Sequence, residues 1–138
     1  MIVVDSSVVA FLLMEGELTP EARELYRRDP DWVTPPIINH ELLNILSAIG
    51  ASGNEEFDIM ETLWKECRAL LGARQQVPDP IKALRRSIQT GISGFEAQYL
   101  SLAEQIDRPL ISEDPRILSA APGRAFSISG YLERFGPG

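Results

Sequence analysis

Short β-branched runs and longer apolar stretches at helical spacing alternate along this chain. Period-two or continuous apolar runs of a few residues are typical of buried strands, and a 3.6-residue period is typical of helices. The runs predict strands at residues 2–4, 32–34, 110–112 and 125–127, with a minor strand at 74–77. The spacing predicts helices at residues 8–14, 19–28, 35–49, 55–71, 79–90, 93–106 and 114–120, a loop at 50–54 and a closing helical turn at 129–135.

Strands separated by helices favour a parallel sheet covered on both faces, because parallel neighbours need crossover connections. The chain has 138 residues and is 44% hydrophobic, which is enough for one core. No repeat, low-complexity stretch or linker divides it. We therefore expect a single α/β domain over residues 1–138, built as three layers with a mainly parallel sheet.

Two acidic residues follow strands of this predicted sheet. Asp5 comes directly after the first strand, and Asp114 follows residues 110–112 at one residue's remove. Ligands of parallel sheets bind where the strands end, so both carboxylates are candidates for a site at the carboxyl edge. Each also has a structural explanation, because Asp5 could cap the first helix, as could Ser6 or Ser7, and Asp114 before Pro115 is typical of a helix N-cap.

Two further acids belong to predicted helices. Glu41 lies close to the apolar side of the helix at 35–49, and no basic residue stands at helical spacing to pair with it. Glu96 stands three residues after Ser93, where it would complete a capping box. The structural and functional interpretations of these acids therefore both stay open.

Four carboxylates brought together repel one another unless a cation is bound among them. Ligands that are oxygen only select a hard cation, so Mg²⁺ fits and Mn²⁺ is a substitute. His40 is the only histidine, which excludes a histidine cluster for zinc. Such an ion lowers the pKa of a bound water for attack on a phosphodiester.

The net charge of −7 argues against broad electrostatic attraction to nucleic acid. The cations are nearly all arginines, with pairs at Arg27-Arg28 and Arg85-Arg86, and arginine matches the geometry of a phosphate. These pairs are equally explained as solvated helix faces. Cys67 is the only cysteine, which indicates a reducing, cytoplasmic compartment. The apolar start is interrupted by Asp5 and lacks a basic leader, so we expect neither a signal peptide nor a membrane association.

Four motifs in this order resemble the PIN domain family of nucleases, in particular its VapC-type toxin branch. The resemblance covers nearly the whole chain and rests on Ile2-Val-Val-Asp-Ser-Ser-Val-Val, His40-Glu-Leu-Leu-Asn-Ile-Leu, Gly94-Phe-Glu-Ala-Gln-Tyr-Leu-Ser-Leu-Ala and Leu110-Ile-Ser-Glu-Asp-Pro-Arg-Ile-Leu. It implies a five-stranded parallel sheet, a metal-dependent ribonuclease activity on RNA, a homodimer and, for toxins, a cognate antitoxin.

The resemblance also implies roles for individual residues. Asp5, Glu96 and Asp114 would hold Mg²⁺, with Glu41 as a further ligand or as the group that orients the attacking water. Three polar residues would hydrogen-bond these carboxylates and aim them: Ser7, Asn44 and Ser112.

One position departs from the family, because Glu96 stands where the third motif usually carries aspartate. Since Mg²⁺ demands near-ideal octahedral geometry, the longer side chain favours reduced activity and keeps a second hypothesis open: a PIN-like binding or scaffold module without catalysis. A phosphoacceptor receiver domain is a third hypothesis. It is disfavoured because the only lysines, Lys65 and Lys82, lie in predicted mid-chain helices and not after a late strand.

Overall fold

A run of three β-branched residues forms the central strand, β1 (Ile2–Val4), and all three residues are fully buried. The computed structural model describes residues 1–53 and 55–136. It pairs β1 with β2 (Trp32–Val33) on one side and with β3 (Leu110–Ile111) on the other, and β4 (Ala125–Phe126) completes the order β2-β1-β3-β4. All three pairings are parallel, as the alternation of strands and helices predicts.

The structure corrects the prediction of a five-stranded sheet. Within the described residues the sheet has four strands, and the segment at 74–77 contributes only an isolated bridge between Thr34 and Gln75. The bridge is held by two backbone hydrogen bonds, from Thr34 N to Arg74 O and from Gln76 N to Thr34 O. It cannot extend further along the chain, because the next N–H on this side of the strand would be that of residue 36, and Pro36 has none to donate.

The helices agree with the predicted spans to within a few residues. One difference lies in the predicted loop at 50–54, because α3 continues to Ala51; Asn54 lies outside the described residues. The helices are α1 (Ser6–Leu13), α2 (Thr19–Arg28), α3 (Ile37–Ala51), α4 (Phe57–Leu71), α5 (Pro80–Thr90), α6 (Gly94–Ile106), α7 (Pro115–Ala120) and α8 (Ile128–Arg134).

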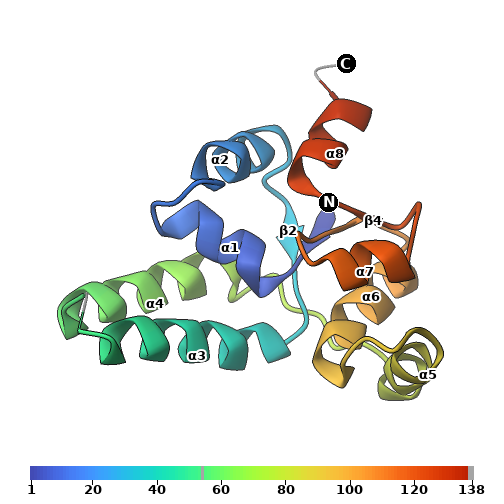
Figure 1. The fold of residues 1–138 in the computed structure, drawn as a ribbon, viewed down its shortest axis with the longest axis horizontal. Helices are drawn as coiled ribbons and strands as arrows, with labels where there is room; N and C mark the ends of the chain where they lie inside the picture. The colour runs from blue at the N-terminus through green and yellow to red at the C-terminus, as the bar shows by residue number, and fades with distance from the viewer. Residues whose placement is uncertain (54, 137–138) are drawn as a thin grey trace.

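Helices lie on either side of the sheet, with α3 and α4 forming a long hairpin at one end of the molecule and α5 packing on α6 at the other (Figure 1). The apolar side chains of the strands, α1, α2 and α6 form one connected core. In the part of the chain that the structure describes, no helix is long and apolar enough to cross a membrane.

The position of β1 determines where a ligand can approach the sheet. From β1 the chain crosses to β2 on one side, and it later returns to β3 on the other side. The connections that leave the carboxyl ends of β1 and β3 therefore run toward opposite edges of the sheet, which makes this position a topological switch point. Ligands of open parallel sheets usually bind at such a point. Asp5 lies at this edge, and its backbone N–H donates to Ile111 O at 3.3 Å.

The central pairing of β1 and β3 gives a direct test of the core. Ile111 is fully buried in β3, so Ile111→Ala should lower the free energy of unfolding by about 2–5 kcal/mol through lost burial and a residual cavity. Ile88 is 75% exposed on α5, so Ile88→Ala is the matched control and should change it by about 0.5 kcal/mol or less. Urea unfolding measures both, and equal losses would contradict the described core.

Candidate functional site

Asp5 is a buried carboxylate at the end of β1, with only 7% of its surface exposed. It caps α1, since its Oδ1 accepts the Val8 N–H at 3.1 Å, and it also accepts a hydrogen bond from Ser112. The pKa of Asp5 is nevertheless raised to about 6; burial is the main cause, the neighbouring carboxylates of Glu41 and Asp114 also raise it, and the two hydrogen bonds lower it. Asp5 is therefore held in an environment that disfavours its negative charge.

Ser112 joins the two acids that follow the adjacent strands. This serine is fully buried directly after β3, where its hydroxyl bonds Asp5 and accepts the backbone N–H of Asp114 at 3.0 Å. Asp114 in turn caps α7 by accepting the Arg116 N–H at 2.9 Å. Ser112 therefore fixes the turn that places Asp114 beside Asp5.

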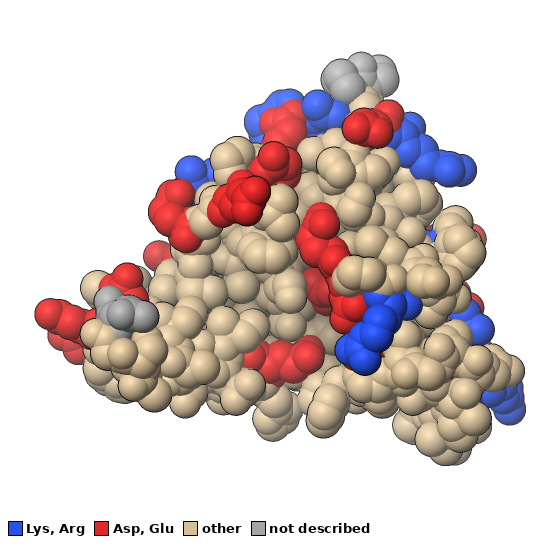
Figure 2. Space-filling model, viewed as in Figure 1, with Lys and Arg blue, Asp and Glu red and all other residues tan. Residues whose placement is uncertain are grey.

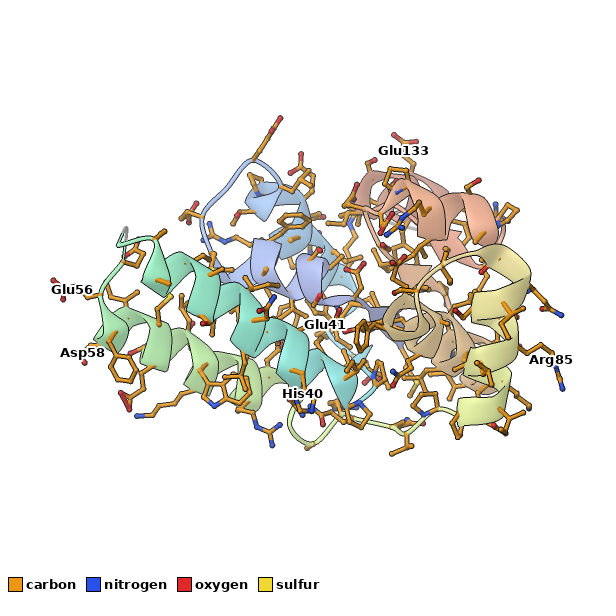
Figure 3. All side chains as sticks on the ribbon, turned by 60° about the horizontal axis from the view of Figure 1, so that its bottom comes forward. His40, Glu41, Glu56, Asp58, Arg85 and Glu133 are labelled. Carbon is orange, nitrogen blue, oxygen red and sulfur yellow. The ribbon has the colours of Figure 1, made fainter. Side chains whose placement is uncertain are left out.

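Glu41 reaches the same place from α3. In Figure 3 its side chain lies in the interior of the molecule, whereas His40 lies on the outer side of the helix. Burial raises the pKa of Glu41, and the charge of Glu96 raises it further. The hydroxyl of Tyr99, a buried residue of α6, donates a short hydrogen bond to Glu41 Oε1, which favours the ionised carboxylate. Tyr99 also hydrogen-bonds Ser6, so it connects Glu41 to the start of α1.

Glu96 lies in the first turn of α6 and is paired with an arginine. Its Oε1 accepts from Arg116 Nη2 at 2.9 Å, and Arg116 Nε lies 3.8 Å from Asp114 Oδ1. Its other oxygen, Oε2, is buried and accepts no hydrogen bond from any residue that the structure describes. The Ser93 hydroxyl caps the helix through the Glu96 N–H at 3.0 Å, which is the serine half of the expected capping box.

The four predicted acids therefore come together from four separate elements. Asp5 is coupled electrostatically to Glu41 and Asp114, and Glu41 to Glu96. Acidic side chains gather in the middle of the face shown in Figure 2, with basic side chains against them. Among the described residues, however, no three acidic, histidine or cysteine side chains form a group that could hold a metal ion as they stand.

The chemistry of the cluster nevertheless suits a divalent cation. Its donors are carboxylate oxygens, which hard cations prefer. One of these oxygens, Glu96 Oε2, is buried without a hydrogen-bond partner among the described residues, and the pKa of Asp5 is raised by burial and, to a smaller extent, by the charges of Glu41 and Asp114. Arg116 supplies a positive charge between Glu96 and Asp114 in this arrangement.

The three residues expected to aim the acids differ in their positions. Ser112 contacts both Asp5 and Asp114, as described above. Ser7 and Asn44 are exposed, and within residues 1–53 and 55–136 no hydrogen bond joins either side chain to one of the four acids. The serine of α1 that connects to the site is Ser6, because the helix begins two residues earlier than its apolar positions predict.

Two contact residues were not singled out from the sequence. Tyr99 stands three residues after Glu96 and Arg116 two residues after Asp114, each within a motif of the family resemblance. The sequence could have indicated Tyr99, because this tyrosine lies on the buried side of an otherwise apolar helix. A buried tyrosine hydroxyl usually has a hydrogen-bond partner. Nothing in the local sequence shows that Arg116 crosses to Glu96, since that ion pair joins α7 to α6.

Comparisons with known proteins identify the family of the chain. The family model of the PIN domain matches residues 2–122, so the chain belongs to the PIN domain family. PIN domains are in general nucleases, and they generally use divalent metals such as Mg²⁺. No curated protein sequence matches the chain.

Solved structures share the fold at low sequence identity. The PAE2754 protein from Pyrobaculum aerophilum is 17% identical with a TM-score of 0.78, covering 99% of this chain and 96% of that one. FitAcB from Neisseria gonorrhoeae is 15% identical with a TM-score of 0.70, covering 94% and 99%. A toxin-antitoxin complex from Klebsiella pneumoniae contains a chain 11% identical with a TM-score of 0.68, covering 93% and 98%.

The raised pKa of Asp5 predicts a specific pH dependence of stability. Because the pKa is about 6 in the fold and 3.8 in the reference state, the folded chain binds more protons between these values. The stabilisation that comes from this additional proton is complete below pH 3.8 and is lost as the pH rises through about 6. Relative to Asp5→Asn, metal-free wild type should therefore lose up to about 3 kcal/mol between about pH 4 and about pH 8.

Urea unfolding in a chelating buffer at the two pH values measures this difference. Asp58→Asn is the matched control, because Asp58 lies on α4 at the far end of the molecule (Figure 3). It should keep the pH dependence of the wild type. An Asp5→Asn variant with the same pH dependence as wild type would show that Asp5 is not the titrating group.

The Tyr99 hydroxyl is expected to stabilise the fold through Glu41. Tyr99→Phe keeps the ring but leaves a half-buried carboxylate without its donor, so the free energy of unfolding should fall by about 1–3 kcal/mol. Tyr131→Phe is the control: its hydroxyl donates to Asp29 at 3.1 Å, but Asp29 also holds the N-terminal ammonium. Its loss should be smaller, and equal losses in urea unfolding would contradict the role of Tyr99.

Proposed function

We propose that this chain is a magnesium-dependent ribonuclease that hydrolyses phosphodiester bonds of RNA at the four-carboxylate site. The observation that supports this proposal is the gathering of Asp5, Glu41, Glu96 and Asp114 at the carboxyl ends of β1 and β3. Burial of Asp5 beside these acids disfavours its negative charge in the metal-free chain, as its raised pKa indicates. A cost of this kind is typical of functional sites.

The proposed roles follow from the environment of each acid. Asp5, Glu96 and Asp114 would hold Mg²⁺ or Mn²⁺, and Glu41, held by Tyr99, would be a further ligand or orient the attacking water. The bound ion would make that water more acidic and neutralise charge on the phosphate. Ser112 hydrogen-bonds the carboxylate of Asp5 and the backbone N–H of Asp114, so it fixes the two residues relative to each other.

Cleavage of a fluorescent single-stranded RNA pool with Mg²⁺, Mn²⁺ or a chelator tests the proposal. We expect cleavage by wild type that requires the metal and falls at least about 100-fold in Asp5→Asn and in Asp114→Asn, because each change removes a ligand from the metal. Asp58→Asn removes the same charge at a distance and should cleave as wild type does. Wild-type rates in both site variants would show that these acids are not catalytic.

A second candidate function is a PIN-like binding module without catalysis. The observation in its favour is the ion pair of Glu96 with Arg116, which occupies the acid that departs from the usual aspartate. Glu96→Asp separates the two functions, because it restores the common residue at this position. Metal-dependent cleavage that appears only in Glu96→Asp would establish that the natural chain is a binding module.

The solved neighbours include a toxin-antitoxin complex, and we propose that this chain is likewise the toxin of a bacterial pair, acting as a homodimer in the cytoplasm. Support for a protein antitoxin comes from an apolar groove of about 550 Å³ between α3 and α4, lined by Leu43, Phe57, Met60 and Trp64 among others. Phe57 is 75% exposed there. Since the chain is acidic, a docking segment with apolar and basic residues would match it.

Purification of the chain together with an antitoxin provides the test of this pairing. Phe57→Asp should weaken the complex at least tenfold, whereas Val77→Asp, at an equally exposed residue outside the groove, should leave it intact. Equal affinities of the two variants would exclude the groove as the docking surface. Sedimentation of the chain alone tests the dimer, which a monomer at micromolar concentration would contradict.

A further inference from the structure

A hollow of about 650 Å³ with polar and apolar walls lies next to the part of the acidic site formed by Glu96 and Asp114, because Arg116, which pairs with both, lines it. It lies between the C-terminal turn of α5, the loop that leads to α6, and α7, and its walls include Thr90, Gly91 and Ser119. Arg116 lines the hollow and also pairs with Glu96, so it stands at the boundary between the hollow and the acidic site. The volume falls in the range of about 300–1,000 Å³ that is common for sites of small ligands.

The charge of the hollow is opposite to that of the molecule. The chain carries a net charge of −7, yet no carboxylate is found among the described residues that line the hollow, and Arg116 is their only charged group. The remaining polar groups are the hydroxyl of Ser119, the amide of Gln89, backbone atoms and the Thr90 hydroxyl, which donates to Arg86 O at 2.6 Å and can only accept from a ligand. The apolar walls are Ile92, Pro115 and Ala120. An anionic ligand that also makes neutral hydrogen bonds would match these walls.

Arg116 has the geometry to bind such a ligand while it stays at the site. Its contacts with Glu96 and Asp114 use the Nη2 and Nε atoms, and among the described residues Nη1 has no hydrogen-bond partner. The side chain is 68% exposed. Guanidinium groups present five N–H donors and bind phosphate by a pair of them, so one arginine can contact a carboxylate and a phosphate together.

We propose that this hollow holds a nucleotide of the RNA strand next to the cleaved phosphodiester, with Arg116 on its phosphate and Thr90 and Ser119 facing its sugar or base. This inference rests on the proposed ribonuclease function and adds the path of the substrate to it. The strand runs from the acids past Arg116 into the hollow. Ser119 lies three residues after Arg116 on α7, so both side chains project from the same face of that helix.

RNA binding in the Asp5→Asn background, in which the strand stays intact, tests the path. The probe is a fluorescein-labelled pool of random single-stranded 12-mer RNA with Mg²⁺, followed by anisotropy. Ser119→Glu places a negative charge in the hollow and should weaken binding about tenfold, and Ser119→Lys should strengthen it. Thr62→Glu, at an exposed position on α4, adds the same charge elsewhere and should change binding less than about twofold.

The salt dependence of RNA binding distinguishes a phosphate contact of Arg116 from a purely structural role of this residue. Loss of one phosphate contact in Arg116→Gln should lower the slope of log K against log salt by about 0.7, the value for a single strand. Thr62→Glu should keep the original slope. An unchanged slope in Arg116→Gln would overturn the phosphate contact.

The result that overturns the path is distinct from the result that overturns the ribonuclease proposal. If wild type cleaves RNA in a metal-dependent manner but Ser119→Glu, Ser119→Lys and Thr62→Glu bind the probe equally, the strand does not enter the hollow and only this inference fails. If wild type neither cleaves nor binds RNA, both proposals fail. Melting temperatures within a few degrees of the parent confirm that the Ser119 variants are folded.

Discussion

The electrostatic cost of gathering four carboxylates where β1 and β3 end is the constraint on which the rest of the site depends. Parallel pairing of these two buried strands places Asp5 beside the turn that carries Asp114, and the packing of α3 and α6 around them adds Glu41 and Glu96. The pKa of Asp5 is raised to about 6 mainly because its carboxylate is buried, and the charges of Glu41 and Asp114 add to this rise.

The surrounding residues reduce the cost without removing it. Ser112 donates to Asp5, Tyr99 donates to Glu41, and Arg116 pairs with Glu96. Each partner comes from an element next to the acid that it stabilises, so the protein holds the carboxylates in fixed places while one oxygen of Glu96 stays without a donor. This combination of fixed acids and residual negative charge is the physical basis of the proposed metal site, and it explains why an exposed arginine lies beside it.

Much of the fold was predictable because its signals are local. The β-branched run before Asp5, the proline after Asp114 and the apolar spacing of the helices are all visible in the sequence, and the structure confirms the elements that they predict. The prediction of a fifth strand was wrong, because Pro36 has no N–H for the next bond and the ladder ends after a single bridge. The contacts of Tyr99 and Arg116 join residues 58 and 20 positions apart, which no local pattern reveals. The choice between Ser6 and Ser7 depended on the first residue of α1, where sequence patterns are least precise.

Binding of Mn²⁺ to the metal-free protein tests the central claim most directly, because it depends on the carboxylates and requires no RNA. The free ion can be followed by its electron paramagnetic resonance signal during titration of wild type, Asp5→Asn and Asp58→Asn. The account predicts uptake of Mn²⁺ by wild type and Asp58→Asn and at least a tenfold weaker affinity in Asp5→Asn. No uptake by wild type, or equal affinity in Asp5→Asn, would contradict a metal site formed by these four acids.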